Sequence, residues 1–214
     1  FIKRYISIST PEVYGNIKEN LVENNYYSPS TPYAASKLAG DLHLMTLFKK
    51  YNFPVTIVRY QNIFGPRMGF KHVIPHLVQR FYEGVQNPFK IYGAGQTRAF
   101  CYISDAVEGT VMALENDNSD QEIYHMGSPE EITIEELTKT VGIIMGYKGE
   151  YVTAPTYPGS VSRRCPDISK SVKMLGYSPK VHWKDGLEET VSWYIDFYKS
   201  GTPIYSGGFK TPDE

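Results

Sequence analysis

The chain has 214 residues, enough for one sizeable core or two smaller ones, and its formal net charge of -1 argues against binding to nucleic acid or to an anionic membrane. No run of apolar residues approaches the length of a membrane span. The two cysteines, Cys101 and Cys165, show neither a disulfide framework nor a metal-binding spacing. We therefore expect a reducing, cytoplasmic location and no metal site.

Strands and helices alternate in the first part of the chain. Residues 3–8 read as a buried strand, and residues 16–31 as a polar surface loop. Pro32 followed by an apolar stripe predicts a helix to about Tyr51, which Asn52-Phe53-Pro54 would end. Residues 55–60 read as a second strand. Strand, helix and strand at this spacing predict a right-handed crossover between two parallel strands.

The rest of the sequence continues the alternation. Further strands are expected at residues 90–93, 98–103 and 122–127. Further helices are expected over residues 73–84, 106–115, 133–145, 167–176 and 185–198. Several helix ends have recognisable signals, namely a cap at Ser104 or Asp105, a capping box at Thr133 and Glu136, a cap at Asp167 and a terminal Gly176.

A tyrosine and a lysine stand one helical turn apart at the start of the first helix. Tyr33 and Lys37 would share a helix face, and an ammonium group beside a phenol favours the phenolate and lowers its pKa. Such a pair is suited to moving a proton to or from a sugar or alcohol hydroxyl. Tyr14 and Lys18 have the same spacing, but Gly15 and Asn16 predict a turn between them.

Polar residues follow both of the first two strands, where parallel sheets gather their ligands. Thr10 and Glu12 follow the first strand and are candidates for chemistry, although a threonine here is also a common turn or capping residue. Asn62 follows the second strand and would bind a ligand or hold its own turn. Arg163 and Arg164 fit a phosphate group bidentately, or form a solvated surface pair.

Five motifs then occur in one order along the chain. The chain resembles the extended short-chain dehydrogenase/reductases that modify nucleotide sugars, the NAD-dependent epimerase/dehydratase family, over about residues 1–199. The motifs are Ser-Thr-Pro-Glu-Val-Tyr-Gly at 9–15, Pro-Tyr-Ala-Ala-Ser-Lys at 32–37, Arg-Tyr-Gln-Asn-Ile-Phe-Gly-Pro-Arg at 59–67, Thr-Arg-Ala-Phe-Cys-Tyr-Ile-Ser-Asp at 97–105 and Arg-Arg-Cys-Pro-Asp-Ile-Ser-Lys at 163–170.

The resemblance implies an α/β fold: the C-terminal part of a doubly wound, Rossmann-like parallel sheet plus a smaller α/β substrate-binding domain. Residues 1–66 would belong to the NAD-binding domain, residues 67–199 mainly to the nucleotide-sugar domain with segments returning to the sheet, and residues 200–214 would form a flexible tail. The family's glycine-rich dinucleotide fingerprint is absent, and the first strand resembles the family's fifth. About a hundred residues would be missing, so we expect the chain as given to bind NAD weakly.

The resemblance also assigns roles. Thr10, Tyr33 and Lys37 would form the catalytic triad. Tyr33 would act as general base on the sugar C4 hydroxyl while hydride passes to NAD. Thr10 would form a hydrogen bond with the same hydroxyl, and Lys37 would bind the cofactor ribose. The resemblance implies NAD in preference to NADP as the cofactor, which Tyr33, Lys37 and Tyr60 would hold. The resemblance also implies residues that bind the nucleotide sugar. Asn62 would lie near the diphosphate, and Arg98 together with Arg163 or Arg164 would bind the phosphate or the nucleotide.

The type of reaction stays open at this stage. Sugar 4,6-dehydratases of the family have an Asp-Glu pair after the threonine, whereas this chain has Pro11-Glu12. UDP-glucuronate decarboxylases also keep only the glutamate, and simple 4-epimerases usually have a small or hydroxyl residue there. A non-catalytic remnant that only binds nucleotide sugars is a further alternative. The family's homodimers form through a four-helix bundle, to which Leu44, Met45 and Leu47 of the Tyr33 helix would contribute.

Overall fold

The computed structural model describes residues 2–84, 87–156 and 159–202. Most of the predicted tail, residues 203–214, therefore lies outside the described residues. The chain divides into two compact units, each built from three segments. Unit 1 comprises Phe1–Ile63, Arg98–Glu131 and Ser162–Val181, and unit 2 comprises Phe64–Thr97, Ile132–Val161 and His182–Glu214.

Unit 1 is built on a parallel sheet of three strands in the order β1 (Tyr5–Ser9), β2 (Val55–Tyr60) and β7 (Ile123–Met126). Tyr5 pairs with Val55, and Ile57 pairs with Ile123. The central strand β2 has the sequence Val-Thr-Ile-Val-Arg-Tyr and is buried along all but its last residue. A strand covered on both faces needs such a run of β-branched residues, which agrees with the parallel topology.

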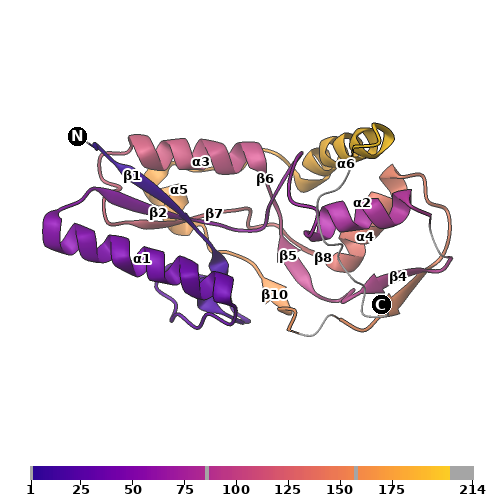
Figure 1. The fold of residues 1–214 in the computed structure, drawn as a ribbon, viewed down its shortest axis with the longest axis horizontal. Coiled ribbons are helices and arrows are strands. Elements are labelled where there is room, and N and C mark those ends of the chain that lie inside the picture. The colour runs from indigo at the N-terminus through magenta and orange to yellow at the C-terminus, as the bar shows by residue number, and fades with distance from the viewer. Residues whose placement is uncertain (1, 85–86, 157–158, 203–214) are drawn as a thin grey trace. The chain divides into compact units, whose positions relative to one another are not determined.

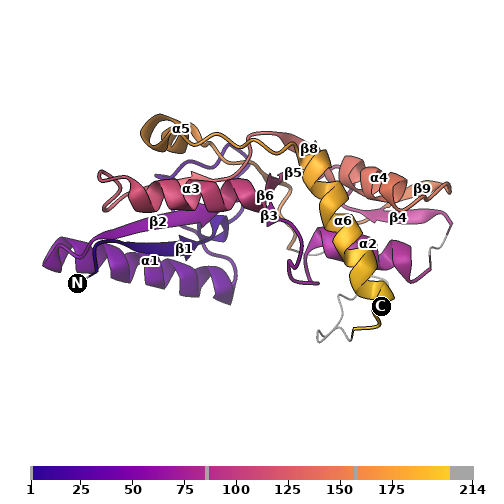
Figure 2. The same cartoon turned by 90° about the horizontal axis from the view of Figure 1, so that it is seen from above.

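Helices cover both faces of this sheet. Figures 1 and 2 show α1 (Pro32–Tyr51) on one face and α3 (Ile103–Glu115) on the other. The short helix α5 (Ser169–Leu175) lies against β7. Between α3, α5 and the sheet a core forms from Val58, Ala113, Tyr124, Met126, Ile168 and Tyr177. A second cluster of Val13, Tyr14 and Leu21 forms at the short 3-10 helix η1 (Pro11–Tyr14) and includes the α1 side chain Leu38.

The described residues of unit 2 form three helices and a two-stranded parallel sheet. The helices α2 (Val73–Tyr82), α4 (Ile134–Ile144) and α6 (Trp183–Lys199) contact one another, and β4 (Phe89–Tyr92) pairs with β9 (Tyr151–Ala154). Aromatic packing dominates this unit, as where Phe81 of α2 stacks on Phe89 of β4 with ring centroids 4.1 Å apart. The other strands are short: β3 (Ile63–Phe64), β5 (Thr97–Ala99), β6 (Cys101–Tyr102), β8 (Glu131–Thr133) and β10 (Arg163–Arg164).

The predicted α/β order of strands and helices is confirmed, and the differences are local. Strand β1 was expected to be buried, but it is an outer strand of the three-stranded sheet, and Tyr5 and Ile8 are exposed. The loop predicted over residues 16–31 contains an isolated bridge from Leu21 to Pro166. In α1 the buried positions are Ala34 and Asp41, whereas Leu42 of the predicted apolar stripe is exposed.

Two of the predicted helix caps are corrected. Helix α3 begins at Ile103, and the buried Asp105 accepts a hydrogen bond from the backbone N–H of Val181 instead of capping its own helix. The N-cap position of α5 is Ile168, although Asp167 does accept from the N–H of Ser169 at 2.8 Å. The Thr133 cap of α4 is confirmed, with its hydroxyl accepting from Glu136 N–H. Gly176, at φ 71°, ends α5 as predicted.

The described helices include none that is both long and apolar enough to cross a bilayer.

Candidate functional site

The first turn of α1 holds the predicted tyrosine and lysine next to β1. Thr31 caps the helix by accepting from the N–H of Ala34 at 3.1 Å, and Pro32 occupies the first turn, where its missing N–H costs nothing. Tyr33 is half exposed. The ammonium group of Lys37 donates to the carbonyl of Ile8 at 3.0 Å, so the start of α1 is attached to the carboxyl half of β1.

Thr10 directly follows β1 and is the N-cap residue of η1. Its side chain is buried, and its hydroxyl accepts from the N–H of Glu12 at 3.3 Å, which is the capping arrangement that the turn interpretation predicted. The hydroxyl of a threonine can still donate one hydrogen bond while accepting another. The structure therefore brings Thr10 to the same edge of the sheet as Lys37, two residues beyond the carbonyl that Lys37 contacts.

The Glu12 carboxylate has contacts on both sides. One oxygen accepts from the hydroxyl of Thr31 at 3.2 Å, and the other lies 3.9 Å from a guanidinium nitrogen of Arg164. Thr31 is also the N-cap of α1, so Glu12 joins the beginning of the Tyr33 helix to Arg164. Its neighbour Pro11 is buried and has no group that can donate a proton.

The predicted arginines divide into two environments. Arg163 forms an ion pair with Glu131 at 2.7 Å and also contacts Asn20, and the hydrogen bond that Arg163 donates to Glu131 raises the pKa of Arg163. Arg164 and Arg98 are more enclosed. Burial, together with the positive charge of Arg164, lowers the pKa of Arg98 to about 10. Burial also lowers the pKa of Arg164, and the charge of Glu12 opposes that change.

Two guanidinium groups that repel each other in an enclosed place would both be stabilised by an anion. Arginine is well suited to bidentate binding of phosphate, because its planar guanidinium group can donate to two phosphate oxygens at once. Arg98 and Arg164 therefore form the better candidate for a phosphate-binding pair than Arg163, which Glu131 already engages.

Asn62 holds the turn after β2. Its backbone is in the left-handed region, with φ 45°, which asparagine tolerates better than most residues. The side-chain amide donates to the carbonyl of Ala99 at 3.0 Å and reaches the carbonyl of Arg164 at 3.5 Å. Tyr60 points toward α3, where its hydroxyl lies 2.8 Å from that of Thr110. Both predicted ligand-binding residues thus have structural contacts of their own.

A buried polar cluster beneath these residues escaped the sequence analysis. It contains Ser9, Tyr14, Asp41, Arg59 and His125, all buried in unit 1. One signal could have revealed it: Arg59 interrupts an otherwise apolar strand, and a charge in a buried strand requires a partner.

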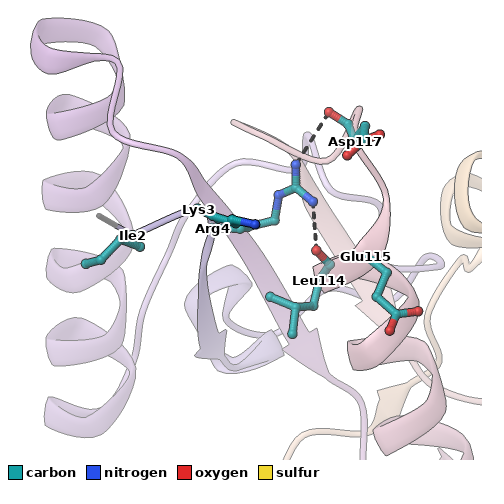
Figure 3. Close-up of a pocket in the computed structure, with 6 residues that line it drawn as sticks. All are labelled: Ile2, Lys3, Arg4, Leu114, Glu115 and Asp117. Atoms are coloured by element: carbon teal, nitrogen blue, oxygen red, sulfur yellow. Dashed lines mark hydrogen bonds between the residues drawn. The ribbon is translucent and has the colours of Figure 1, made fainter.

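A shallow pocket lies at the opposite end of β1, as Figure 3 shows. Arg4 crosses it, donating to the carbonyl of Leu114 at 2.7 Å, to that of Asp117 at 3.5 Å, and to the carboxylate of Asp120 at 2.8 Å. None of the predicted site residues lines this pocket. It lies at the amino end of β1, whereas Thr10 follows the carboxyl end.

Residues 2–127 match the model of the NAD dependent epimerase/dehydratase family. A dTDP-glucose 4,6-dehydratase from Actinoplanes is 35% identical over 90% of this chain and 60% of its own length. A UDP-N-acetyl-alpha-D-glucosaminuronate decarboxylase from Bacillus cytotoxicus is 33% identical over 90% of this chain and 64% of its own length. The chain therefore spans about three fifths of the length of these curated relatives.

Solved structures agree with these sequence relatives. A UDP-glucuronic acid 4-epimerase from Bacillus cereus, in complex with UDP-glucuronic acid and NAD, superposes with a TM-score of 0.84 at 31% identity, over 92% of this chain and 62% of that one. A dTDP-glucose 4,6-dehydratase from Streptomyces venezuelae with NAD bound gives a TM-score of 0.83 at 31% identity, over 93% of this chain and 62% of that one. The predicted Rossmann-like class is thereby confirmed. From its motifs, its fold and these relatives, the chain belongs to the NAD dependent epimerase/dehydratase family.

Proposed function

We propose that this chain contributes the acid–base groups and the nucleotide-sugar-binding residues of an NAD-dependent enzyme that works through a 4-keto-sugar intermediate. The observation that carries the proposal is the bond from Lys37 to the carbonyl of Ile8. It joins the helix of Tyr33 to the strand end at which Thr10 and Glu12 lie. A base, a hydroxyl and a carboxylate within one such edge suit proton transfer at a sugar.

The residues present fit one end of the cofactor. An ammonium group has three donors, and one of those of Lys37 is used on Ile8, so two remain for the hydroxyls of a ribose. The sequence contains no glycine-rich strand–turn–helix unit for the pyrophosphate. Tyr60, predicted at the cofactor, would contribute through its ring, because its hydroxyl contacts Thr110. The chemistry that bound NAD would supply is a hydride acceptor for C4 of the sugar.

The roles of the chain's own residues follow from their positions. Tyr33 takes the proton of the C4 hydroxyl, and Thr10 donates a hydrogen bond to the same oxygen while accepting from Glu12 N–H. Arg98 and Arg164 bind the phosphates, with Arg163 as the alternative. Asn62 lies next to the backbone of Arg164, whose carbonyl its amide reaches at 3.5 Å, and would lie near the diphosphate. Glu12 removes a proton next to the C4 ketone when the substrate displaces its contact with Thr31.

One observation favours decarboxylation as a second candidate. Elimination of water needs an acid, and the position before Glu12 is the buried Pro11, which has no proton to give. Loss of carbon dioxide from a 4-keto uronate needs no such acid at that position. A UDP-glucuronate substrate is therefore the specific alternative to the epimerase/dehydratase assignment.

Location and assembly follow the same reasoning. Both cysteines are free and buried, which supports the predicted cytoplasmic location. On α1, Leu42 is exposed and Leu44, Met45 and Leu47 are only partly buried, which supports the predicted homodimer through this helix.

The test is to incubate the full-length protein with NAD and a panel of UDP-, dTDP-, GDP- and CDP-sugars, and to identify products by mass. Loss of carbon dioxide, loss of water and no change in mass with a new stereochemistry separate the three reactions. Tyr33→Phe should abolish turnover and leave nucleotide-sugar binding largely intact by calorimetry. Tyr51→Phe is the matched control, since Tyr51 is an exposed tyrosine at the other end of α1.

Two results would change the conclusion. Turnover by Tyr33→Phe within a few-fold of the parent would refute the role of Tyr33. Binding of a nucleotide sugar without any product, by the full-length protein with NAD present, would instead support the non-catalytic alternative.

A further inference from the structure

A charged residue is completely buried in the central strand of unit 1. Arg59 has no exposed surface, and taking a guanidinium group out of water costs several kcal/mol unless it is paired and hydrogen-bonded. One of its terminal nitrogens donates to the carboxylate of Asp41 at 3.0 Å, and the other donates to the hydroxyl of Tyr14 at 2.5 Å. Burial opposes the charge, but the interactions with Tyr14, Tyr27 and Asp41 outweigh it and raise the pKa of Arg59.

Asp41 sets which face of α1 meets the sheet. Asp41 and Ala34 are the two buried positions of this helix, seven residues apart and hence on one face. Lys37 lies one turn before Asp41 on that same face. The carboxylate oxygen that receives Arg59 also accepts from the hydroxyl of Ser9 at 2.7 Å. Ser9 directly precedes Thr10, so one carboxylate oxygen joins α1, β2 and the end of β1.

The other side of Arg59 fixes the turn that holds Glu12. Tyr14 is the last residue of η1, and its hydroxyl lies 2.8 Å from Nε2 of His125. Burial, aided by the charge of Arg59, lowers the pKa of His125 to about 3, so the imidazole is neutral. The directions of the bonds then follow: Arg59 donates to Tyr14, and Tyr14 donates to Nε2. The Nδ1–H of His125 donates to the carbonyl of Asp167 at 3.3 Å.

We infer that the ion pair of Arg59 and Asp41, with Ser9 and Tyr14, is a positioning cluster for the predicted site. It fixes the end of β1 and the turn η1, beside Thr10 and Glu12, relative to α1, the helix of Tyr33 and Lys37. This inference rests on the proposed function for its catalytic consequence, but its structural consequence is independent of it. The cluster sets where Lys37 lies relative to Ile8.

The alternative is that the cluster contributes only to stability. Replacing a buried ion pair by apolar residues of similar volume is commonly neutral or stabilising. If the cluster acts only through stability, the double variant Asp41→Leu/Arg59→Met should fold and should leave the reactivity of Lys37 and kcat unchanged. A positioning cluster would not, because apolar side chains cannot direct Ser9 and Tyr14 by hydrogen bonds.

The chain offers a matched control pair. Arg4 and Asp120 form another Arg–Asp ion pair in unit 1, at 2.8 Å, next to the amino end of β1. Arg4 directly precedes β1, whereas Thr10 directly follows it. The variants to compare are Asp41→Leu/Arg59→Met and Arg4→Met/Asp120→Leu, with Asp41→Asn as a milder change that keeps the shape of the side chain.

Two measurements test the inference. The first is the rate at which acetic anhydride modifies Lys37, read by mass spectrometry: it should rise several-fold in the Asp41 variants and stay unchanged in the control pair. The second is turnover with NAD and the active nucleotide sugar. There kcat should fall about tenfold or more, because small misplacements of reacting groups are costly, while KM changes little because Arg98 and Arg164 are untouched.

The two measurements separate the two proposals. If the full-length protein has no turnover, the proposed function fails, and the labelling of Lys37 still tests the positioning cluster. A folded double variant with unchanged Lys37 labelling and unchanged kcat would overturn the inference. Equal effects in the Arg4/Asp120 control would overturn it too. If the double variant does not fold, the same two measurements are made on Asp41→Asn, and unchanged Lys37 labelling with unchanged kcat would again overturn the inference.

Discussion

Replacing Gly109 of α3 by alanine should lower the stability of unit 1, although alanine has the higher helix propensity. Gly109 lies in the interior of α3 and is buried. A Cβ atom at this position would lie 2.5 Å from the sulfur of Met126 and 2.8 Å from the ring of Tyr177. Real Cβ atoms do not approach other heavy atoms so closely, so Gly109→Ala requires neighbouring groups to move.

The neighbours differ in how far they can move. A methionine side chain is flexible and can change rotamer at small cost. Tyr177 is fixed, because its ring is buried and its hydroxyl donates to the carbonyl of Gly127 at 3.0 Å. Overpacking a core costs about 1–3 kcal/mol, and we expect the upper half of that range here. The higher helix propensity of alanine offsets about 1 kcal/mol of this loss in the free energy of unfolding. The net loss is about 1–2 kcal/mol.

Gly40→Ala is the matched control. Gly40 also lies inside a helix of unit 1, but it is exposed and a Cβ atom there would meet nothing within 4 Å. The Gly40→Ala variant should therefore gain about 1 kcal/mol in its free energy of unfolding, from helix propensity alone. Urea-induced unfolding followed by circular dichroism compares both variants with the parent. Since both glycines lie in unit 1, the difference between the variants isolates the packing cost, about 2–3 kcal/mol. Equal stability of the two variants would show that α3 is not packed as described.

Two further effects on stability are expected. Thr133→Ala should lower the free energy of unfolding by about 1 kcal/mol through loss of the α4 cap, whereas Thr140→Ala on the same helix, where the hydroxyl does not cap, should be neutral or slightly stabilising in the same urea titration. His125 titrates at about pH 3 when folded and near 6.5 when unfolded, so stability should fall as pH drops below about 6.5, by up to about 1.4 kcal/mol per pH unit. His125→Gln should make that fall shallower in urea titrations at several pH values; an unchanged slope would contradict the neutral, buried imidazole.

Much of the secondary structure was predictable because its signals are local. The apolar run of β2, the Pro32 start and Asn52 end of α1, and the Thr133 cap each depend on neighbours within a few residues. Local signals failed where distant segments intervene. Asp105 resembles a helix cap in sequence, yet it accepts from Val181, which is 76 positions further along the chain. No nearby residue indicates that contact.

The same distinction holds for the candidate site. The sequence alone supplied the residues that we propose for the chemistry, namely Thr10, Glu12, Tyr33 and Lys37, and its motifs indicated the family. Only the tertiary structure decided how they are held: Lys37 on the carbonyl of Ile8, and the arginines divided between Glu131 and an enclosed pair. The reason is physical. A buried charge such as Arg59 needs partners, and its partners Tyr14 and Asp41 come from other segments, which only folding brings together.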